Sequence, residues 1–332
     1  MKVNIKDVAA AAGVAQSTVS RVMNNSGYTS KQTQRKVIKA MEELGYSPSA
    51  LAVSFSKSQT RIIGFIVPDI SIGFFGKLLY AVDKLAAKNN YRMILCNSDE
   101  NPEKERAALK DLLSYKVGGI LIIPVENSPN ADLVNRIHSS GTPVVCIDKE
   151  MSGAHCDSIY IDNHKGAQEL TQFALEKGHR ELAFLIYDSH PSVTASYIRG
   201  IEEAFKLHGL CLNPECIFAG TDLDACSRFI CEQCNSSQRP AAFLSFSSDF
   251  TAVCYRTLTT NHVSIPDEMD LIGYDDLKML EDLGYKITLT PSTADMGTVA
   301  IRMLLGRMET PDENLPPQYV TLPTSISISS LK

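Results

Sequence analysis

Side chains that can recognise the edges of DNA bases lie close together near the N-terminus. Gln16 and Ser17 are followed one helical turn later by Arg21. Glutamine can pair with adenine through two hydrogen bonds, arginine can do the same with guanine, and serine can bond to several bases. Val19 and Val22 fall on the other side of the same segment. The spacing therefore predicts an amphipathic helix with a polar outer face.

A preceding helix would hold this one in place. Ile5, Val8, Ala9 and Ala12 recur at the spacing of one helix face. Gly13 then tolerates the positive φ that ends a helix and lets the chain turn. Two short helices joined by such a turn describe a helix-turn-helix, whose second helix enters the major groove of DNA. An ordinary helical hairpin at the start of a globular domain is the alternative.

Other polar residues of this region fit contacts to phosphate, which position a protein on DNA without reading its sequence. These residues are Lys6, Thr18, Ser20 and Asn24. Ser30 can cap a third helix that ends at Gly45. For each polar residue, a place on an ordinary solvated face is the alternative.

The charge distribution favours nucleic acid as a partner of the N-terminal region. Residues 1–60 contain eight Lys and Arg against three Asp and Glu, a net charge of +5. The whole chain carries −6, so the other 272 residues carry −11. A basic head on an acidic body fits a head that meets phosphate and a body that does not.

The composition indicates a globular protein of two or three domains. The chain has 332 residues, 44% of them hydrophobic and 21% charged, without an apolar run long enough to span a membrane. The N-terminus starts a charged amphipathic segment instead of a signal-peptide core, so we expect a cytoplasmic protein. The nine cysteines are odd in number and scattered, so we expect reduced thiols.

Metal-cluster and enzyme chemistry have little support. Cys226, Cys231 and Cys234 match a ferredoxin-type spacing, but residues 223–234 have helical periodicity, which favours small buried side chains. The phosphate-loop, zinc-protease and serine-hydrolase motifs are absent from the sequence, and the seven histidines are dispersed. We expect neither an enzyme nor a metal or cofactor.

From residue 61 the chain alternates between strands and helices. Strands are expected at 62–67, 91–96, 118–123, 143–147, 158–161, 181–186, 215–219, 241–246 and 269–273. Helical periodicity fills the intervals. This alternation predicts parallel sheets covered by helices and joined by right-handed crossovers, and the number of strands predicts two similar lobes. The fold class is therefore α/β with an all-α N-terminal head.

The order of the motifs resembles the lactose-repressor (LacI/GalR) family of bacterial transcription factors. The matching segments are Ile5–Ala9, Thr18–Val22, Gly45–Pro48, Gly178–Arg180 and Ile272–Asp276. They extend over essentially the whole chain. The resemblance implies a helix-turn-helix head, a hinge helix and a two-lobed body like that of periplasmic binding proteins. The implied domains are a head 1–48, a hinge or linker 49–60, an N-terminal lobe 61–161 plus 290–320, and a C-terminal lobe 162–289 plus 321–332.

The resemblance also assigns roles in DNA binding. Positions Gln16 and Ser17 set operator choice in the family, Arg21 usually contacts a base, and Tyr28 lies where relatives place another groove contact. Phe55 replaces the leucine that the family's hinge helix inserts into the minor groove, and phenylalanine is among the wedges of architectural proteins. A merely flexible tether is the alternative for the linker.

For the body, the resemblance implies that an effector binds between the lobes. Ligands of open α/β sheets lie beyond the carboxyl ends of the strands. The candidate effector-binding residues, carried over by position, are Phe74, Phe75, Asp148, Tyr197, Asp222, Asp249 and Asp275. Carboxylates accept hydrogen bonds from sugar hydroxyls, and aromatic faces stack on apolar ring faces. Helix capping or a turn is the alternative for such an aspartate.

This cleft departs from the family where an arginine usually grips the effector, because that position is Tyr197. An acidic cleft without arginine fits a neutral polyol or a cation and would repel phosphate or carboxylate. We expect three partners: near-palindromic double-stranded operator DNA, a neutral carbohydrate-like effector and a second copy of the chain. The alternatives are a sugar-binding receptor with no regulatory DNA role, and a regulator with a non-sugar effector or none.

Overall fold

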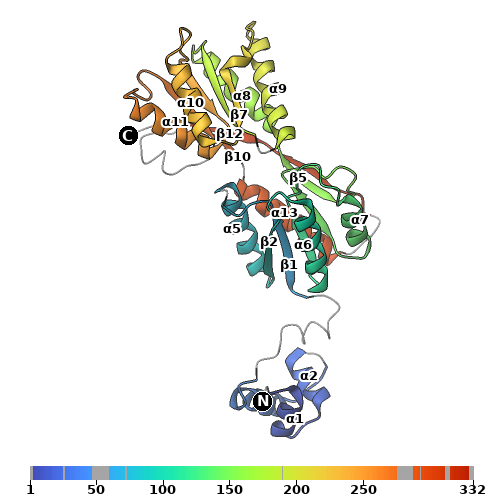
Figure 1. The fold of residues 1–332 in the computed structure, drawn as a ribbon. Coiled ribbons are helices and arrows are strands. Elements are labelled where there is room, and N and C mark those ends of the chain that lie inside the picture. Colours follow the sequence, from blue (N-terminus) through green and yellow to red (C-terminus); the bar gives the residue numbers. More distant parts are fainter. Residues whose placement is uncertain are drawn as a thin grey trace.

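The computed structural model describes residues 3–24, 27–46, 60–71, 73–188, 190–274, 287–291, 293–310 and 315–328. Figure 1 shows a head of short helices and two α/β lobes, each built on its own sheet. The expected fold class is therefore confirmed. None of the described helices combines the length and the apolar character that a membrane span requires.

The head consists of α1 (Ile5–Ala12), α2 (Gln16–Asn24) and α3 (Lys31–Glu43), as the apolar spacing predicts. Asn4 caps α1 in a reciprocal capping box with Asp7, and Gly13 ends it at φ 64°. Ser30 caps α3 by accepting a hydrogen bond from the Thr33 amide. The three helices share a core that includes Val8, Ala9, Ala12, Val19, Val37 and Ala40.

The first lobe is built on a parallel sheet with the strand order β11-β5-β4-β3-β1-β2. Its strands are β1 (Ile62–Val67), β2 (Arg92–Asn97), β3 (Gly119–Ile122), β4 (Val144–Ile147), β5 (Asp157–Ile161) and β11 (Tyr319–Leu322). Its helices are α5 (Gly73–Lys88), α6 (Pro102–Ser114), α7 (Ala131–Ser139) and α13 (Thr293–Glu309). One core joins a face of the sheet to α5 and α13, and another joins the opposite face to α6 and α7. Coverage of both faces explains why the central strands read as continuous apolar runs.

The second lobe has the strand order β12-β10-β9-β8-β6-β7, in which β12 runs antiparallel to β10. Its strands are β6 (Leu182–Tyr187), β7 (Ile217–Gly220), β8 (Ala242–Ser245), β9 (Asp270–Tyr274), β10 (Ile287–Pro291) and β12 (Thr324–Ile328). Its helices are α8 (Asn163–Glu176), α9 (Pro191–Leu207), α10 (Leu223–Cys234) and α11 (Ser248–Thr260). The chain passes between the two sheets three times, after β5, β10 and β11.

Three features differ from the sequence-based expectation. Helical periodicity predicts a helix over 194–208, but α9 begins at Pro191, because proline fits the first helical turn, where an amide has no partner. Strand β7 begins at residue 217 because Pro214–Cys216 forms a short helical turn capped by Asn213. The strand–helix alternation read from the sequence ends at residue 273, whereas β10, α13, β11 and β12 follow it.

Candidate functional site

The second helix of the head presents the three candidate base-reading side chains on one surface. Gln16, Ser17 and Arg21 are exposed, whereas Val19 is fully buried in the core of the head. A helix of this kind can lie in the major groove with its polar side toward the bases while its apolar side stays packed.

The other candidate DNA contacts are accessible wherever the structure describes their side chains. Partly or fully exposed are Lys6, Thr18, Ser20 and Tyr28. Tyr28 is 91% exposed on the loop before α3, an unusual degree of exposure for a large aromatic side chain. Asn24 ends α2, but its side chain lies outside the described residues, as does all of Phe55.

Asp148 lies directly after β4, at the carboxyl edge of the first sheet. Its backbone has φ 68°, a left-handed conformation that Asp and Asn adopt more readily than most residues. Its amide donates to the carbonyl of Ile159 on the adjacent strand at 2.8 Å. Burial raises the pKa of its carboxyl to about 6, against an opposing influence of Lys149. A carboxyl with a perturbed pKa at the carboxyl edge of a sheet is a candidate ligand contact.

Asp148→Asn should stabilise the protein at neutral pH. The folded-state pKa lies above the unfolded value of 3.8, so the folded state binds more protons between these values, and its stability falls as pH rises toward 6. Above pH 6 the buried carboxylate destabilises the fold by about 1–3 kcal/mol. Asparagine tolerates the same φ without the charge.

Chemical denaturation at pH 7.5 should show a larger free energy of unfolding for Asp148→Asn than for the unmodified protein. The difference should vanish near pH 4. The control Asp83→Asn, at an exposed position of α5, should leave the free energy of unfolding unchanged at both pH values. An unchanged free energy of unfolding at pH 7.5 would contradict the burial argument.

The two candidate aromatic contacts of the first lobe have different positions. Phe75 is 4% exposed and belongs to the core between the sheet and α5. Phe74 is only partly buried and meets Phe75 edge-on, with ring centroids 5.3 Å apart. The expectation of a ligand contact is therefore corrected for Phe75, because α5 turns its ring into the core. Phe74 remains a candidate.

Tyr197 is also packed inside its lobe. It is 6% exposed, and its ring lies against Phe246 with centroids 4.8 Å apart. Its hydroxyl donates to Oδ1 of Asn163 at 3.1 Å. Asn163 lines a cavity of about 470 Å³ between the lobes, together with Asp148 and Ser192. Tyr197 is thus placed to support a cavity residue, which corrects the expectation of a direct contact.

The candidate aspartates of the second lobe follow its strands. Asp222 caps α10 by accepting from the amides of Asp224 and Ala225, which lower the pKa of its carboxyl. Asp249 is in the first turn of α11. Burial, and then the carboxylates of Asp249 and Asp69, raise the pKa of the Tyr187 phenol. Asp69 follows β1, so a carboxylate of the first lobe contributes to this effect on the second lobe.

Asp275, the fourth candidate aspartate, lies outside the described residues. The structure therefore associates Asp148, but neither Asp222 nor Asp249, with the described inter-lobe cavity.

A group of polar and charged residues that the sequence did not indicate joins the two lobes. Lys149 Nζ lies 3.1 Å from Glu100 Oε1 and 3.1 Å from each ring nitrogen of His190. Ser192 Oγ donates to Glu126 Oε2 at 3.3 Å. Glu100, Glu126 and Lys149 follow strands of the first sheet, while His190 and Ser192 begin α9 of the second lobe. Residues 41 to 66 positions apart make these contacts, so no local motif could reveal them.

The cysteines and histidines do not form a metal site in the described part of the chain, where no three potential metal-binding side chains come together. Residues 223–234 form the predicted helix, and burial raises the pKa of the Cys226 thiol to about 12. Such a thiol stays protonated at neutral pH. His179 bonds to Asp270 at 3.3 Å, and Lys177 bonds to the same carboxylate, so His179 joins the end of α8 to the start of β9.

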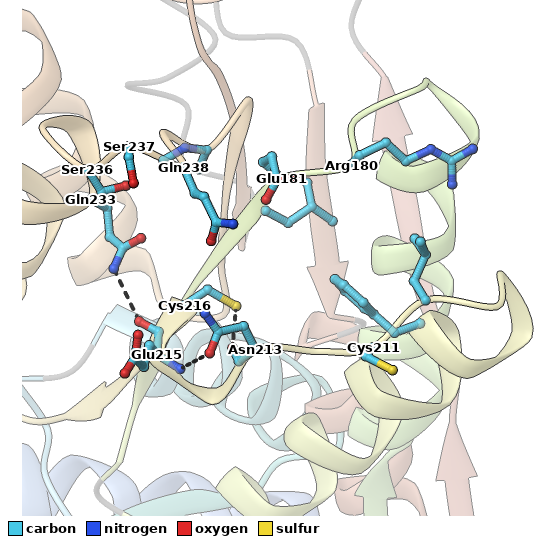
Figure 2. A pocket seen from close by; sticks show the side chains of 14 residues that line it. Arg180, Glu181, Cys211, Asn213, Glu215, Cys216, Gln233, Ser236, Ser237 and Gln238 are labelled. Carbon is cyan, nitrogen blue, oxygen red and sulfur yellow. Dashed lines mark hydrogen bonds between the residues drawn. The ribbon is translucent and has the colours of Figure 1, made fainter.

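A second cavity, of about 400 Å³, lies elsewhere on the second lobe (Figure 2). Arg180, Glu181, Gln233 and Gln238 are among its polar lining residues. It lies beside the amino ends of β6, β7 and β8, and ligands of such sheets bind at the carboxyl ends. None of the candidate effector-binding residues lines it.

Comparisons with known proteins agree with this architecture. The lacI family of bacterial regulatory proteins matches residues 4–49, and the periplasmic binding proteins and sugar binding domain of the LacI family match residues 60–307. The sucrose operon repressor of Pediococcus pentosaceus is 32% identical over 98% of this chain and 98% of its own length.

Two solved structures have the same fold over 98% of the chain. A LacI-family transcriptional regulator from Silicibacter pomeroyi has a TM-score of 0.82 and 23% identity, covering 98% of both chains. The Lac repressor dimer bound to operator and the anti-inducer ONPF has a TM-score of 0.83 and 20% identity, with the same coverage. Together with the family matches, these findings show that the chain belongs to the lacI family of bacterial regulatory proteins.

Proposed function

We propose that this lacI-family regulator is a repressor that binds a near-palindromic operator as a homodimer, and that a neutral carbohydrate-like effector between its lobes changes its operator affinity. The main observation in support of this proposal is the exposed polar face of α2. Gln16, Ser17 and Arg21 are available on a helix whose opposite side is packed in the head, and their chemistry suits base edges. Operator DNA lies in the cytoplasm, where the protein would act.

The inter-lobe cavity supports a neutral effector. Asp148 provides an acceptor for hydroxyl groups, and Asn163, Ser192 and Ser196 add uncharged polar atoms. Lys149 also lines the cavity, but its ammonium is already engaged by Glu100 and His190, so it is a poor anchor for an anion. The similar sucrose operon repressor is named for a sugar operon, which agrees with this class.

The effector would act by favouring one arrangement of the lobes. Because the linker connects the head to the first lobe, a change in lobe arrangement can change how the hinge presents two heads to DNA. Such a ligand must bind one arrangement more tightly than the other, since equal affinity shifts nothing. The effector would therefore alter operator affinity in proportion to its preference between the two arrangements.

Exposed apolar side chains on the first lobe support the homodimer. Tyr80 on α5 is 69% exposed, and Leu95 on the edge strand β2 is 40% exposed. Ile70 is exposed as well, and its amide donates to Asn97 at the end of β2. Unpaired edge strands and exposed apolar side chains are typical of interfaces. A two-fold pair would place two heads on the two halves of a palindrome.

A ligand panel tests the effector. Operator binding is measured by fluorescence anisotropy while neutral mono- and disaccharides, sugar phosphates, sugar acids and polyamines are added in turn. At least one neutral sugar should change operator affinity by about tenfold, and Asp148→Asn should remove this response without changing affinity in its absence. A response to anionic ligands alone would overturn the effector class. Operator binding that no ligand changes would favour a regulator with another effector or none, and absence of operator binding would favour a sugar-binding receptor.

A further inference from the structure

We infer that Lys149 is a positioning residue that holds the two lobes in the arrangement of this structure by bridging Glu100 and His190. In doing so it would set how readily the inter-lobe cavity opens. This inference rests on the proposed function only in assigning the inter-lobe cavity to an effector. The arrangement of the lobes can be measured without operator or effector, so the two can be tested separately.

The geometry makes Lys149 the centre of the bridge. Its ammonium is 3.1 Å from Glu100 Oε1 within its own lobe and 3.1 Å from the His190 ring nitrogens across the gap. Glu100 Oε1 is itself 3.2 Å from His190 Nε2. The three groups therefore form a closed triangle with two corners on the first lobe and one on the second.

The burial of Lys149 depends on this triangle. Lys149 is 4% exposed, and lysine is almost never buried without a partner. Burial, and then the Lys149 charge, lower the pKa of His190 to about 4, so at neutral pH the imidazole is uncharged and accepts a hydrogen bond. Separation of the lobes would remove this acceptor and expose the ammonium to water. The contact is thus specific to one lobe arrangement.

His190 is free to make this contact because of its place in α9. It is the N-cap residue of the helix, yet its side chain makes no capping hydrogen bond. Two residues later, Ser192 bonds to Glu126 of the first lobe. The start of α9 therefore docks on the first lobe at two points.

In the contact between Ser192 and Glu126, the loop of the first lobe that carries Glu126 is held by a buried carboxylate. Glu105 is fully buried and accepts from the Val125 amide at 2.7 Å and from Asn130 Nδ2 at 2.8 Å. It also bonds to Ser128. These bonds fix the loop that carries Glu126, so the docking surface for α9 is preformed.

The local charges make the lysine necessary. Glu100, Glu126 and Asp148 follow strands of the first lobe, and Asp188 precedes α9 and acts on His190. Without Lys149, the carboxylates of Glu100 and Asp148 would lose the positive charge beside them, and the first-lobe side of the contact would carry only negative charge. Like charges at close range repel, and the approaching start of α9 follows Asp188, a further carboxylate. Loss of the ammonium should therefore open the lobes.

A single tryptophan provides the readout, since the chain contains none. Tyr160 lines the inter-lobe cavity and is half-buried, so Tyr160→Trp places a fluorophore on the cavity wall. In this background Lys149→Met should raise the acrylamide quenching constant about twofold or more, and Lys149→Arg should restore most of the protection. The control is Lys165→Met, which removes an exposed lysine paired with Glu169 within α8 and should leave quenching unchanged.

A second variant separates lobe opening from misfolding. His190→Asn removes the ring from the bridge but supplies a preferred N-cap for α9, so it cannot act by weakening that helix. It should raise quenching as Lys149→Met does without lowering the thermal unfolding midpoint. Unchanged quenching in His190→Asn, or an equal rise in Lys165→Met, would overturn the inference. If the quenching pattern is as expected but the unmodified protein binds no operator, or responds to no neutral sugar, the proposed function alone would be contradicted.

Discussion

Replacing Arg21 by methionine should weaken operator binding by about 5- to 150-fold, which corresponds to about 1–3 kcal/mol for one bidentate arginine–guanine contact. Arg21 is exposed one turn after Gln16 and Ser17 on α2. Methionine keeps the length and helix propensity of the side chain but cannot donate to a base. The loss should be concentrated at one base position, so affinities for operators changed at that position should become nearly equal.

A matched control distinguishes base reading from general attraction to phosphate. Lys39→Met removes one positive charge from the same head, at an exposed position of α3 where Lys39 pairs with Glu43 at 3.6 Å. Affinity should then change by less than about twofold. Equal losses in the two variants, both without loss of base preference, would show that Arg21 contributes only charge. Anisotropy titrations at one stated salt concentration are required, because phosphate contacts are salt-dependent.

Gly200→Ala should destabilise the second lobe by about 3 kcal/mol, at the upper end of the usual cost of overpacking. A Cβ at Gly200 in α9 would lie 2.2 Å from the backbone carbonyl oxygen of His164 and 3.0 Å from Ala167 Cβ, both in α8. A backbone atom cannot move aside as a side chain can, so the two helices would have to separate. The thermal unfolding midpoint should fall by roughly 6–12 °C.

Gly306→Ala in α13 is the matched control for this prediction. No atom would lie within 4 Å of the new Cβ, and alanine favours the helix over glycine by about 0.5–1 kcal/mol. This variant should therefore unfold at the same or a slightly higher temperature. If Gly200→Ala were as stable as Gly306→Ala, the close approach of α8 and α9 would be wrong.

Local signals in the sequence were sufficient for the head and for most elements of the body. Gly13 and Ser30 mark helix ends because their effects depend on neighbouring backbone atoms. Apolar runs marked the buried strands for a similar reason. The later helix α13 has a readable apolar spacing in Met296, Ala300 and Leu304, but its return to the first sheet depends on chain topology that no local pattern specifies.

The site was harder to predict because position along the chain does not determine the direction of a side chain. Phe74 and Phe75 are adjacent, yet only Phe75 is buried in the core. The family resemblance assigns an effector contact to the position of Tyr197, but its ring packs on Phe246. Lys149 was missed because its partners are distant in sequence: Glu100 meets it only when the first lobe has folded, and His190 only when the second lobe docks on the first.

Selection of bound duplexes from a random pool by the purified protein, at a stated near-physiological salt concentration, tests the central claim most directly. We predict an inverted repeat with a flexible pyrimidine–purine step at its centre, as expected for a dimer that inserts a wedge such as Phe55. Genes beside genomic copies of the repeat would then nominate effectors. Recovery of no motif, or of isolated half-sites only, would contradict the account of a dimeric operator-binding repressor.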